Sequence, residues 1–552
     1  MYGTSALPDG WLEPDLGPGA SATWRVLRGL RGRLLDRYRR SWLDPEGAQL
    51  EALARVLDAA RGTAFAQEHG LEGVASLDEY RATLAVRPMS EHEGWLRRAV
   101  AEGPGVVTRH PHLAYNRTSG TTGIPKDLPV TAPWAQAVAE AQQVWVTAMV
   151  AEHPSVAAVG ARALNTVGRR VEALSPAGLP IGSNTGRMRG AQPWWIKLRY
   201  AVPARVFEIS EAELRQYVLL RLALAVDVRV WTTANPSTLL ALCRAMTRWR
   251  EPLSADLVDR TLNRGPAAAL SPADRRALNP WLWRKRSLPR DWRPAAFWPN
   301  LRCINCWKGG SAPFFIERLP DAVGVRLPVR EVGVSASEGH IALPLHSSWW
   351  GGVVHVRGHL VELVPEGGGP AVLPHEAEVG GIYRVALSTT AGLYRADLGD
   401  RVRVEGRYLN TPVIRFVGKV GDVISITGEK VTAEQIAAAA ARVLGPGVVG
   451  LAAVGRVAEQ PRLQVVVEGP IPEGAAVALD AELQRLNGEY ASKRHSGRYE
   501  IPEITPASEG TFDRWRRHRT MEGAADGQIK DPIVVDRARF ERLAAGWRGS
   551  AE

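Results

Sequence analysis

The chain has 552 residues, more than a single hydrophobic core usually supports, so we expect two or more domains. Hydrophobic residues make up 45% of the chain and charged residues 23%, and this ordinary composition excludes the disordered, collagen-like and fibrous classes of protein. The net charge of +11 would suit a basic nucleic-acid-binding protein, which stays open as the alternative from another class. No recognition motif for nucleic acids accompanies the charge, so we expect no such partner.

Only three cysteines occur, Cys243, Cys303 and Cys306, which is too few for a disulfide framework and is typical of the reducing cytoplasm. Cys303 and Cys306 form one isolated C-x-x-C pair, and we interpret its surroundings as a buried strand rather than a zinc or redox site. No apolar run reaches the about 18 residues that a membrane-spanning helix needs, and the N-terminus does not have the pattern of a signal peptide. We therefore expect a cytoplasmic protein without a membrane span.

The first predicted element is an arginine-rich helix between Trp24 and Trp42, in which apolar residues recur at helical spacing. An amphipathic helix docked on the body with its arginines in solvent is the favoured interpretation, and a helix on a membrane surface is the alternative. Helical patterns follow over residues 45–100, 133–149 and 211–224, and a strand-like segment begins at Val228. This alternation of helices and strands predicts an α/β architecture with a largely parallel sheet.

From Val353 the pattern changes to short strands separated by glycine and asparagine turns, which predicts a mixed or antiparallel β subdomain. These predicted strands are 353–356, 360–364, 381–387, 400–404 and 413–417. A glycine-containing hinge follows at 416–422, then a strand at 423–426 and a capping box at Thr432–Gln435 that opens a helix to about Leu444. Two strands, 448–454 and 463–467, and a helix over 479–493 complete a compact α+β unit.

The sequence thus predicts an α/β protein with a large N-terminal body and a small mobile α+β domain. The body, residues 1–420, holds α/β sheets and a β subdomain and would bind the substrates. The C-terminal domain covers residues 421–552, with the boundary within Gly418–Asp422.

The most informative segment is Tyr115–Thr131, where hydroxyl side chains interleave with glycines. Small residues of this kind let backbone N–H and side-chain O–H groups converge on an anion, and Lys126 adds a positive charge. The Walker A pattern is not satisfied, which argues against a P-loop NTPase. The segment therefore predicts a phosphate-binding loop of another kind, formed by Thr118, Ser119, Gly120, Thr121, Thr122 and Gly123.

The string T-S-G-T-T-G-I-P-K resembles the phosphate-binding loop of the adenylate-forming superfamily. Further segments resemble the Gretchen Hagen family of acyl-acid amido synthetases, in order, from about residue 50 to the C-terminus. They are Thr63–Gly70, Ser76–Arg81, Trp298–Leu301, Gly309–Ser311, Ser335–Gly339 and Leu393–Asp400. The resemblance implies a ligase that uses ATP and Mg²⁺ to join a small carboxylic acid to an amine or amino acid through an acyl-adenylate, and we expect a monomer or a weak homodimer.

The resemblance also implies roles for individual residues. The loop and Lys126, as a catalytic residue, would hold the β- and γ-phosphates, and Glu338 would bind Mg²⁺, which prefers oxygen ligands. Asp400 would accept hydrogen bonds from the ribose hydroxyls, and Lys419 stands where relatives usually have an arginine near the ribose or phosphate. Residues around the adenine and phosphates would be Val334, Ser335, Ala336 and Ser337.

This sequence departs from the plant members of that family at two positions. They carry an aromatic residue at the position of Val334, where it stacks on adenine, so we expect either weaker ATP binding here or a substitute aromatic side chain elsewhere. Asp397 stands where they have an arginine, and the sequence assigns it no role.

Three C-terminal lysines, Lys430, Lys493 and Lys530, are candidates for the residue that approaches the α-phosphate. The segment Gly527–Pro532 resembles the C-terminal segment of the family, which favours Lys530 as the catalytic residue. The acid pocket is expected between the phosphate loop and residues 340–350, with Trp349 and Trp350 as possible walls for a hydrophobic or aryl acid. A ligase that transfers the acyl group to coenzyme A or a carrier protein is the nearest alternative.

Overall fold

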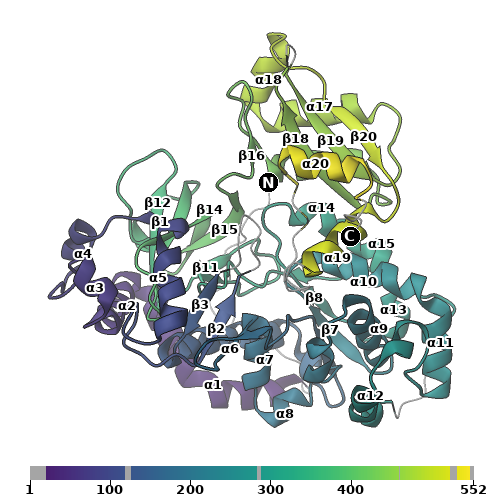
Figure 1. Ribbon diagram of the computed structural model, residues 1–552, viewed down its shortest axis with the longest axis horizontal. Coiled ribbons are helices and arrows are strands. Elements are labelled where there is room, and N and C mark those ends of the chain that lie inside the picture. The colour runs from purple at the N-terminus through teal and green to yellow at the C-terminus, as the bar shows by residue number, and fades with distance from the viewer. Residues whose placement is uncertain are drawn as a thin grey trace.

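The computed structural model describes residues 20–118, 126–282, 288–458, 461–521, 531 and 533–547, with side chains from residue 29 onward. In Figure 1 the C-terminal unit, in green and yellow, stands above a wider body, in purple and teal. Among the described residues no helix is long and apolar enough to cross a membrane.

The N-terminal part of the body is helical. Its elements are α1 (Ala20–Leu43), α2 (Pro45–Ala60), α3 (Ala64–Glu68), α4 (Leu77–Thr83) and α5 (Met89–Glu102). The interpretation of α1 as a docked amphipathic helix is confirmed where its side chains are described, because Leu34, Tyr38 and Trp42 are buried. Leu30 and Leu43 are exceptions, at 76% and 44% exposed.

A four-stranded sheet holds the predicted phosphate loop. Its strands, in spatial order, are β3 (Asp127–Val130), β2 (Ala114–Arg117), β6 (Pro180–Gly182) and β5 (Ala173–Leu174). The adjoining helices are α6 (Ala132–Glu152), α7 (Asn184–Ala191) and α8 (Trp194–Lys197). β2 and β3 form an antiparallel hairpin, so the predicted loop connects two neighbouring strands.

The second sheet of the body is parallel throughout, as the sequence predicts. Its strands, in spatial order, are β4 (Arg162–Asn165), β7 (Val228–Thr232), β8 (Cys303–Asn305) and β9 (Val329–Arg330). The helices around it are α9 (Ala212–Ala223), α10 (Pro236–Arg248), α11 (Arg250–Asp259), α12 (Pro272–Leu278), α13 (Pro294–Phe297), α14 (Ala312–Ile316) and α15 (Leu319–Val323). Cys303 and Cys306 are buried in and directly after β8, and burial raises the pKa of the Cys303 thiol to about 12, which confirms their structural interpretation.

The predicted β subdomain is a seven-stranded, mostly antiparallel sheet. Its strands, in spatial order, are β10 (Ala342–Leu343), β11 (Gly352–Val354), β15 (Thr411–Lys419), β14 (Ala396–Tyr408), β13 (Ile382–Ser388) and β12 (Leu360–Pro365), with β1 (Arg87–Pro88) beside β14. Predicted strand 400–404 is only the middle of β14, because the preceding Ala396 and Asp397 already pair with β13 and β1. Asp400 therefore lies well inside a strand and not at its start.

The C-terminal unit is α+β, as predicted. Its elements are β16 (Val423–Ile424), β17 (Val431–Thr432), α16 (Ala433–Val443), β18 (Gly450–Arg456), β19 (Arg462–Glu468), α17 (Ala475–Leu486), α18 (Gly488–His495), β20 (Glu503–Ala507), α19 (Thr511–Met521) and α20 (Arg537–Ala544). The capping box at Thr432 and Gln435 is confirmed. The single helix over 479–493 is wrong, because Asn487 ends α17 and its side chain accepts the N–H of Tyr490 to begin α18.

The body and the C-terminal unit share buried contacts. Arg318, after α14, donates hydrogen bonds to the carbonyls of Leu444, Gly445 and Val448 in the connection between α16 and β18. One hydrophobic cluster also runs from the helices of the body into α16 and α17. The boundary at residues 420 and 421 falls between β15 and β16, and together with the mobility of residues 421–552 it stays a prediction.

Candidate active site

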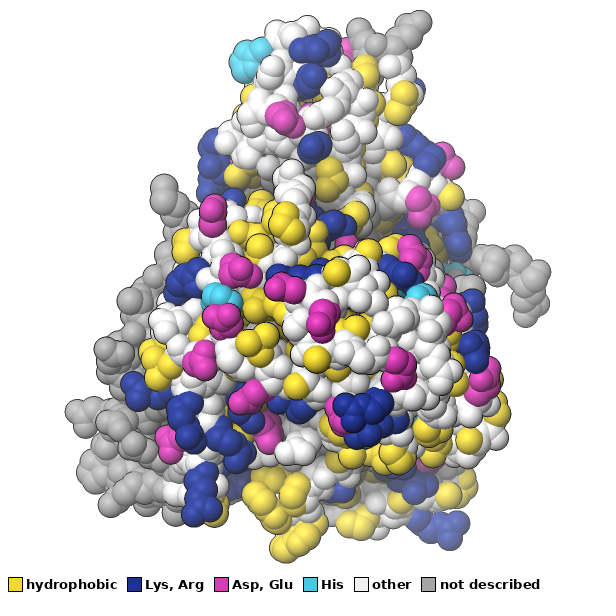
Figure 2. All heavy atoms as spheres, turned by 90° about the vertical axis from the view of Figure 1, so that its left-hand side faces the viewer, with side chains coloured by type: hydrophobic (Ala, Val, Ile, Leu, Met, Phe, Trp, Pro, Cys, Tyr) yellow, Lys and Arg dark blue, Asp and Glu magenta, His cyan; other side chains and the backbone are white. Residues whose placement is uncertain are grey.

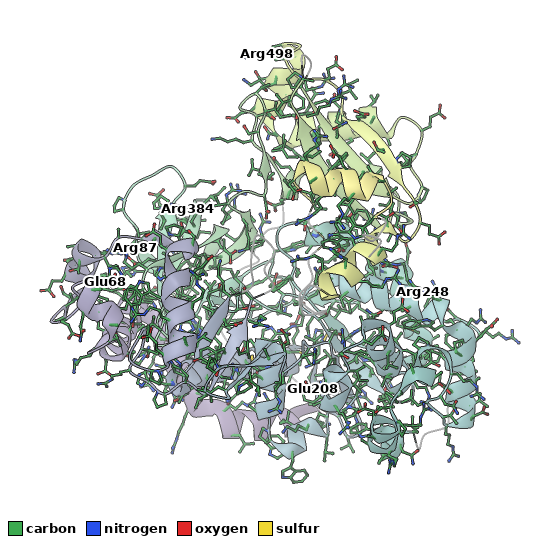
Figure 3. All side chains as sticks on the ribbon, viewed as in Figure 1. Glu68, Arg87, Glu208, Arg248, Arg384 and Arg498 are labelled. Carbon is green, nitrogen blue, oxygen red and sulfur yellow. The ribbon has the colours of Figure 1, made fainter. Side chains whose placement is uncertain are left out.

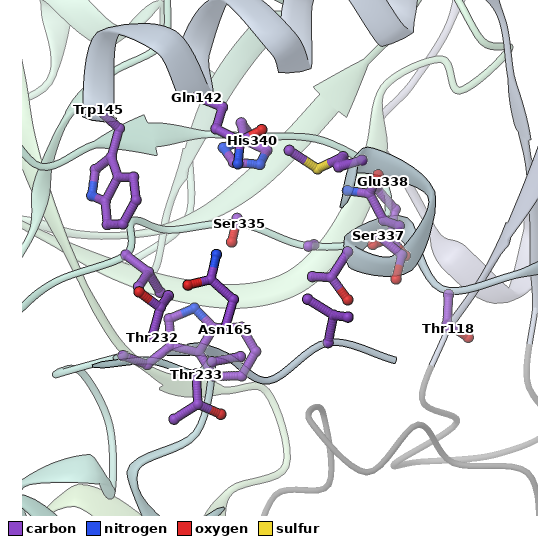
Figure 4. Close-up of a pocket in the computed structure, with 18 of the residues that line it drawn as sticks. Thr118, Gln142, Trp145, Asn165, Thr232, Thr233, Ser335, Ser337, Glu338 and His340 are labelled. Carbon is purple, nitrogen blue, oxygen red and sulfur yellow. The ribbon is translucent and has the colours of Figure 1, made fainter. Parts of the chain in front are cut away.

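A cavity of about 380 Å³ opens where the four parallel strands of the body end. Ligands in α/β proteins characteristically bind at the carboxyl ends of parallel strands. Each strand supplies residues to this wall, namely Asn165–Val167 from β4, Thr232–Ala234 from β7, Trp307 after β8 and Val332 after β9. Figure 4 shows Asn165, Thr232 and Thr233 on one side of the cavity, with Gln142 and Trp145 of α6 across from them.

Segment 335–338 forms another wall of this cavity. Its turn is closed by hydrogen bonds between the backbones of Ala336 and Gly339, in both directions, at 3.0 and 3.2 Å. Trp134 of α6 donates its Nε1–H to the carbonyl of Glu338 at 2.8 Å and thereby fixes the end of the turn. In Figure 4 Ser337 and Glu338 lie close together at one end of the cavity, with Thr118 beyond them.

The side chain of Glu338 is only partly exposed. Burial raises the pKa of its carboxyl, while the positive charges of Lys419 and Lys126 act in the opposite direction. A cation brought to this cavity would favour the charged form of this carboxyl. Glu338 is thus placed to interact with positive charge.

Asp400 and Lys419 form an ion pair on the floor of the same cavity. They face each other in the register of β14 and β15, and Lys419 Nζ lies 2.6 Å from Asp400 Oδ1. Burial acts to lower the pKa of the Lys419 ammonium, but the carboxylates of Asp400 and Glu338 outweigh it, and the pKa is raised. Lys419 therefore carries its charge at neutral pH.

The two ends of the predicted phosphate loop also reach the cavity. Thr118 and Lys126 are hydrogen-bonded to each other twice, from each backbone N–H to the other residue's oxygen, both at 2.9 Å. Lys126 Nζ lies 3.2 Å from Glu93 Oε1. Ser119, Gly120, Thr121, Thr122, Gly123 and Lys530 lie outside the described residues, so their roles stay predictions.

Val334 lies beside this cavity but not in its wall. Its side chain is 5% exposed and packs with Ile341 and Leu343. It borders a second cavity of about 920 Å³ between the body and the C-terminal unit, together with Gly309, Gly310 and the hinge. Ser335, Asp400 and Lys419 border both cavities.

Sequence reasoning missed Glu331, which holds segment 332–338 in place. Its buried carboxylate accepts the backbone N–H groups of Lys308, Val332 and Gly333 at 2.7 to 3.0 Å. Burial raises the pKa of Glu331 to about 7, and these hydrogen bonds partly oppose the shift. The sequence gives no signal for this role, because Lys308 comes to Glu331 only when β8 and β9 pair.

The expectation that Trp349 and Trp350 wall the acid pocket is wrong for the described cavity. Trp349 is 3% exposed and packs edge-on against Tyr408, with ring centroids 6.1 Å apart. Trp350 lies under the ammonium of Lys308, 4.7 Å from Nζ to its ring centroid. The tryptophans that border the cavity are Trp145 and Trp307.

Asp397, to which the sequence assigned no role, has a structural one. Its carboxylate pairs with Arg384 of β13 and accepts the backbone N–H of Gly399 at 2.9 Å. Gly399 has a φ of 66°, a conformation that favours glycine. Asp397 therefore stabilises the backbone just before Asp400.

The residues around Glu338 fit a magnesium ion that arrives with a nucleotide. Among the described residues no group of three histidine, cysteine, aspartate or glutamate side chains could hold a metal alone. Mg²⁺ bound to nucleotides commonly uses one or two carboxylates and completes its shell with phosphate oxygens and water. The carboxylate of Glu338, at the cavity, matches that donor set.

Three models of the GH3 family match the chain in order. They describe the N-terminal domain of the family, at residues 34–329, its central domain, at 353–419, and its C-terminal domain, at 448–539. A probable indole-3-acetic acid-amido synthetase of Oryza sativa subsp. japonica is 23% identical, covering 90% of this chain and 92% of that protein. A jasmonoyl-L-amino acid synthetase of Nicotiana attenuata is also 23% identical, covering 88% of this chain and 90% of that protein.

Solved structures show the same fold. The GH3.15 acyl acid amido synthetase matches with a TM-score of 0.79 at 18% identity, over 93% of this chain and 95% of that one. A 2-hydroxyisobutyryl-CoA ligase in its postadenylation state matches with a TM-score of 0.50 at 16% identity, over 90% of each chain. The first likeness extends over the body and the C-terminal unit alike.

Proposed function

Because the chain belongs to the GH3 family, whose N-terminal model alone matches more than half of it, we propose that it is an ATP-dependent acyl-acid amido synthetase. The enzyme activates a carboxylic acid as an acyl-adenylate with release of pyrophosphate. It then transfers the acyl group to an amine, such as an amino acid, to form an amide. Curated relatives over most of the chain are synthetases that conjugate acids to amino acids, which supports this assignment.

One observation carries the proposal. The carboxylate of Glu338, the Asp400–Lys419 ion pair and both ends of the predicted phosphate loop border one cavity at the ends of the parallel strands. These groups come from distant parts of the sequence, and each has a use in binding a triphosphate beside a carboxylic acid. Their convergence is what adenylation requires.

Activation is needed because a carboxylate does not react with an amine at neutral pH, since its leaving group would be oxide. In the first step a carboxylate oxygen attacks the α-phosphorus of ATP, and the bond between that phosphorus and the pyrophosphate oxygen breaks with its electron pair leaving on pyrophosphate. In the second step the amine nitrogen attacks the acyl carbon, AMP leaves with the electrons of the carbon–oxygen bond, and the nitrogen loses a proton.

The residues of the cavity would divide the binding of ATP between them. Asp400 would accept hydrogen bonds from the ribose hydroxyls, and Lys419 beside it would offset negative charge on the phosphates. Lys126, Ser337 and the loop 118–123 would hold the phosphates, so that the ATP phosphates replace Glu93 as the partner of Lys126. Val334, Ser335 and Ala336 would face the adenine, and Lys530 would approach the α-phosphate.

Glu338 would hold Mg²⁺ together with phosphate oxygens. The ion would neutralise negative charge on the phosphates when bound. Glu338 would hold the ion from a fixed backbone, because Trp134 donates a hydrogen bond to its carbonyl.

Exchange of labelled pyrophosphate into ATP tests this function. With Mg²⁺ present, we expect exchange that depends on an added acid from a panel of aryl and fatty acids. Exchange that is absent with every acid of a broad panel would contradict the proposal.

The acceptor is tested separately, because adenylation also precedes transfer to coenzyme A or a carrier protein. Mass spectrometry of reactions that contain an amino acid mixture and coenzyme A side by side distinguishes an amide from a thioester. We expect the amide, and a thioester as the main product would favour the ligase alternative.

A further inference from the structure

The two cavities of the active site meet at four residues. Trp307, Ser335, Asp400 and Lys419 border both the cavity of about 380 Å³ at the strand ends and the cavity of about 920 Å³ beneath the C-terminal unit. A nucleotide whose ribose is held by Asp400 must therefore lie at this junction. Its base must lie within reach of the side chains there.

The backbone around Trp307 is held rigidly at the end of β8. Cys306 donates its N–H to the carbonyl of Arg330, beyond which β9 ends, and Trp307 donates its N–H to the carbonyl of Ala234, two residues beyond β7. Lys308 then donates its N–H to the carboxylate of Glu331. Three successive residues are thus fixed to the chain at the ends of the two strands that flank β8.

The direction of the indole follows from this arrangement. The side chain of Cys306 is fully buried on the core side, and that of Lys308 is also buried. Trp307 between them is only partly buried and borders the two cavities. A large aromatic surface is therefore presented at the junction on a rigid support.

The other aromatic side chains around the cavities each border only one of the two. Phe416 packs against Gly309 and Gly310, where even an added Cβ would meet it at 3.0 to 3.1 Å. Trp145 donates its Nε1–H to the carbonyl of Glu331 and has the guanidinium of Arg330 over its ring, and Arg189 covers the ring of Tyr200. Among the described residues, Trp307 is the aromatic residue that borders both cavities.

Val334 cannot supply stacking, since it is aliphatic and 5% exposed. We infer that Trp307 provides the aromatic surface on which the adenine of ATP stacks in this chain, so that the base is held from the end of β8. This inference rests on the proposed function, because it takes the nucleotide from it. Stacking depends on the flat face of the base and not on its edges, so Trp307 supplies affinity while the selection of adenine over other bases depends on other groups.

Three variants test the inference. Trp307→Leu keeps an apolar side chain but removes the ring, Trp307→Phe keeps a ring, and Trp194→Ala removes a tryptophan that is 73% exposed on α8. The probe is AMP, and its affinity is measured by titration calorimetry on the full-length proteins. Inorganic tripolyphosphate, which lacks a base, is the second probe, and its affinity is measured in the same way.

We expect Trp307→Leu to weaken AMP binding by about tenfold, the size of effect that loss of one stacked base gives. Trp307→Phe should lie within about threefold of the unmodified protein, Trp194→Ala should not differ from it, and tripolyphosphate should bind all of them alike. If Trp307→Leu binds AMP as well as the unmodified protein does, or weakens both probes equally, the inference is wrong. Melting curves show whether each variant is folded. If Trp307→Leu is not folded, Trp307→Met takes its place, with the same expected and contradicting results.

The outcome is separate from that of the proposed function. A protein that binds AMP through Trp307 but shows no acid-dependent exchange keeps the inference and loses the synthetase. A protein that shows exchange and is unaffected by Trp307→Leu keeps the synthetase and loses the inference. A protein that does not bind AMP at all contradicts the inference directly.

Discussion

At the scale of single residues, Glu338 is the side chain whose charge the proposed chemistry needs most. Glu338→Gln keeps its size and removes its charge, so the cation that accompanies ATP loses its protein ligand. We expect the rate of acid-dependent pyrophosphate exchange to fall by about 100-fold or more at saturating ATP. The matched control is Glu378→Gln, on an exposed position before β13, which should exchange at the unmodified rate.

The initial rate of exchange measures this effect, and the melting curve shows that the variant is folded. Exchange by Glu338→Gln within about threefold of the unmodified rate would contradict the assignment of Glu338. Asp400 and Lys419 are assigned to the site because they share a cavity with Glu338, so their assignment would then be weakened.

Buried histidines give a second prediction at this scale. His359 is 1% exposed, and burial, together with the nearby His340, lowers its pKa to about 3, while burial lowers the pKa of His340 to about 4. Each neutral histidine contributes to the free energy of unfolding, because its pKa is lower in the folded protein than in the unfolded chain. This contribution is complete above about pH 6.5 and is lost as the pH falls toward the folded-state pKa.

We therefore expect the free energy of unfolding to fall by about 2 kcal/mol per histidine between pH 7 and pH 5, as measured by urea denaturation. His359→Asn removes one titrating group and should flatten this dependence, whereas His495→Asn, on the exposed end of α18, should not. An equal slope in all three proteins would show that His359 does not titrate in this way.

At the scale of elements, one buried ion-pair cluster joins α4, β12 and the chain just before β14. Glu362 is 1% exposed and accepts hydrogen bonds from Arg395 at 2.8 and 3.0 Å and from Arg81 at 2.9 Å. Arg395 also donates to the carbonyl of Leu84. Arg395, the arginine of the Leu393–Asp400 segment, thus has a structural role. The cluster holds in place the start of the strand that carries Asp400.

Removing the carboxylate would leave two arginines without their partner in a buried place. We expect Glu362→Gln to lower the free energy of unfolding by about 3 kcal/mol, as measured by denaturation in urea. The matched control is Glu366→Gln. Glu366 directly follows β12, which carries Glu362, and its more exposed carboxylate pairs with Arg401 at 2.8 Å. A loss below about 1 kcal/mol in Glu362→Gln would contradict this account.

Elements whose signals are local could be predicted from the sequence. The capping box of α16, the parallel strands of the body and the antiparallel strands after Val353 depend on neighbouring residues, and they are present. The split between α17 and α18 was missed because Asn487 continues a helical pattern and stops the helix through its side chain. Predicted strands were shorter than the observed ones where pairing with a neighbouring strand extends them, as in β14.

Site residues could likewise be predicted where a local sequence motif marks them, and not where their role depends on the assembled fold. Thr118, Ser335, Glu338 and Asp400 were predicted as site residues because short motifs surround them. The fold brings them to one cavity, and their roles stay predictions. Glu331, Trp307 and Trp145 carry no local pattern, since their roles arise where strands and helices distant in the sequence meet. Trp349 was misplaced for the same reason, because burial against Tyr408 is a property of the assembled sheet.

At the scale of the whole molecule, the basic excess is spread and partly paired. Figure 2 shows Lys and Arg side chains interleaved with Asp and Glu over the visible face. On α1, Arg31 donates to Thr147 and Arg37 lies 3.7 Å from Glu140, so both are engaged with α6. Each ion pair uses one charge of either sign, so such pairing leaves the net charge of +11 unchanged.

A chain of ion pairs joins the C-terminal unit to the body. Asp513 of α19 pairs with Arg244 and Arg248 of α10 at 2.9 and 3.0 Å, and Arg517 pairs with Glu213 of α9 at 2.6 Å. Figure 3 shows Arg248 at the edge of the body, near α19. Because these groups are partly exposed, each contributes little alone, and salt weakens them.

We expect Asp513→Asn to loosen this contact without unfolding either part. Hydrogen exchange of the backbone amides in α19 should become about fivefold faster, a difference of about 1 kcal/mol, and those in β13 should not change. Asp536→Asn, which changes an exposed carboxylate at the start of α20, is the control. Unchanged exchange in α19 would show that the ion pairs do not hold the two parts together.

The central claim is that the acid reacts through an acyl-adenylate, and the path of oxygen tests it most directly. The acid is labelled with ¹⁸O in its carboxylate, and the reaction with ATP and the amine is followed by mass spectrometry of the nucleotide. The account predicts one ¹⁸O in AMP for each amide formed, because the attacking oxygen leaves with the α-phosphorus. Unlabelled AMP, or label in inorganic phosphate with ADP as the nucleotide product, would contradict it.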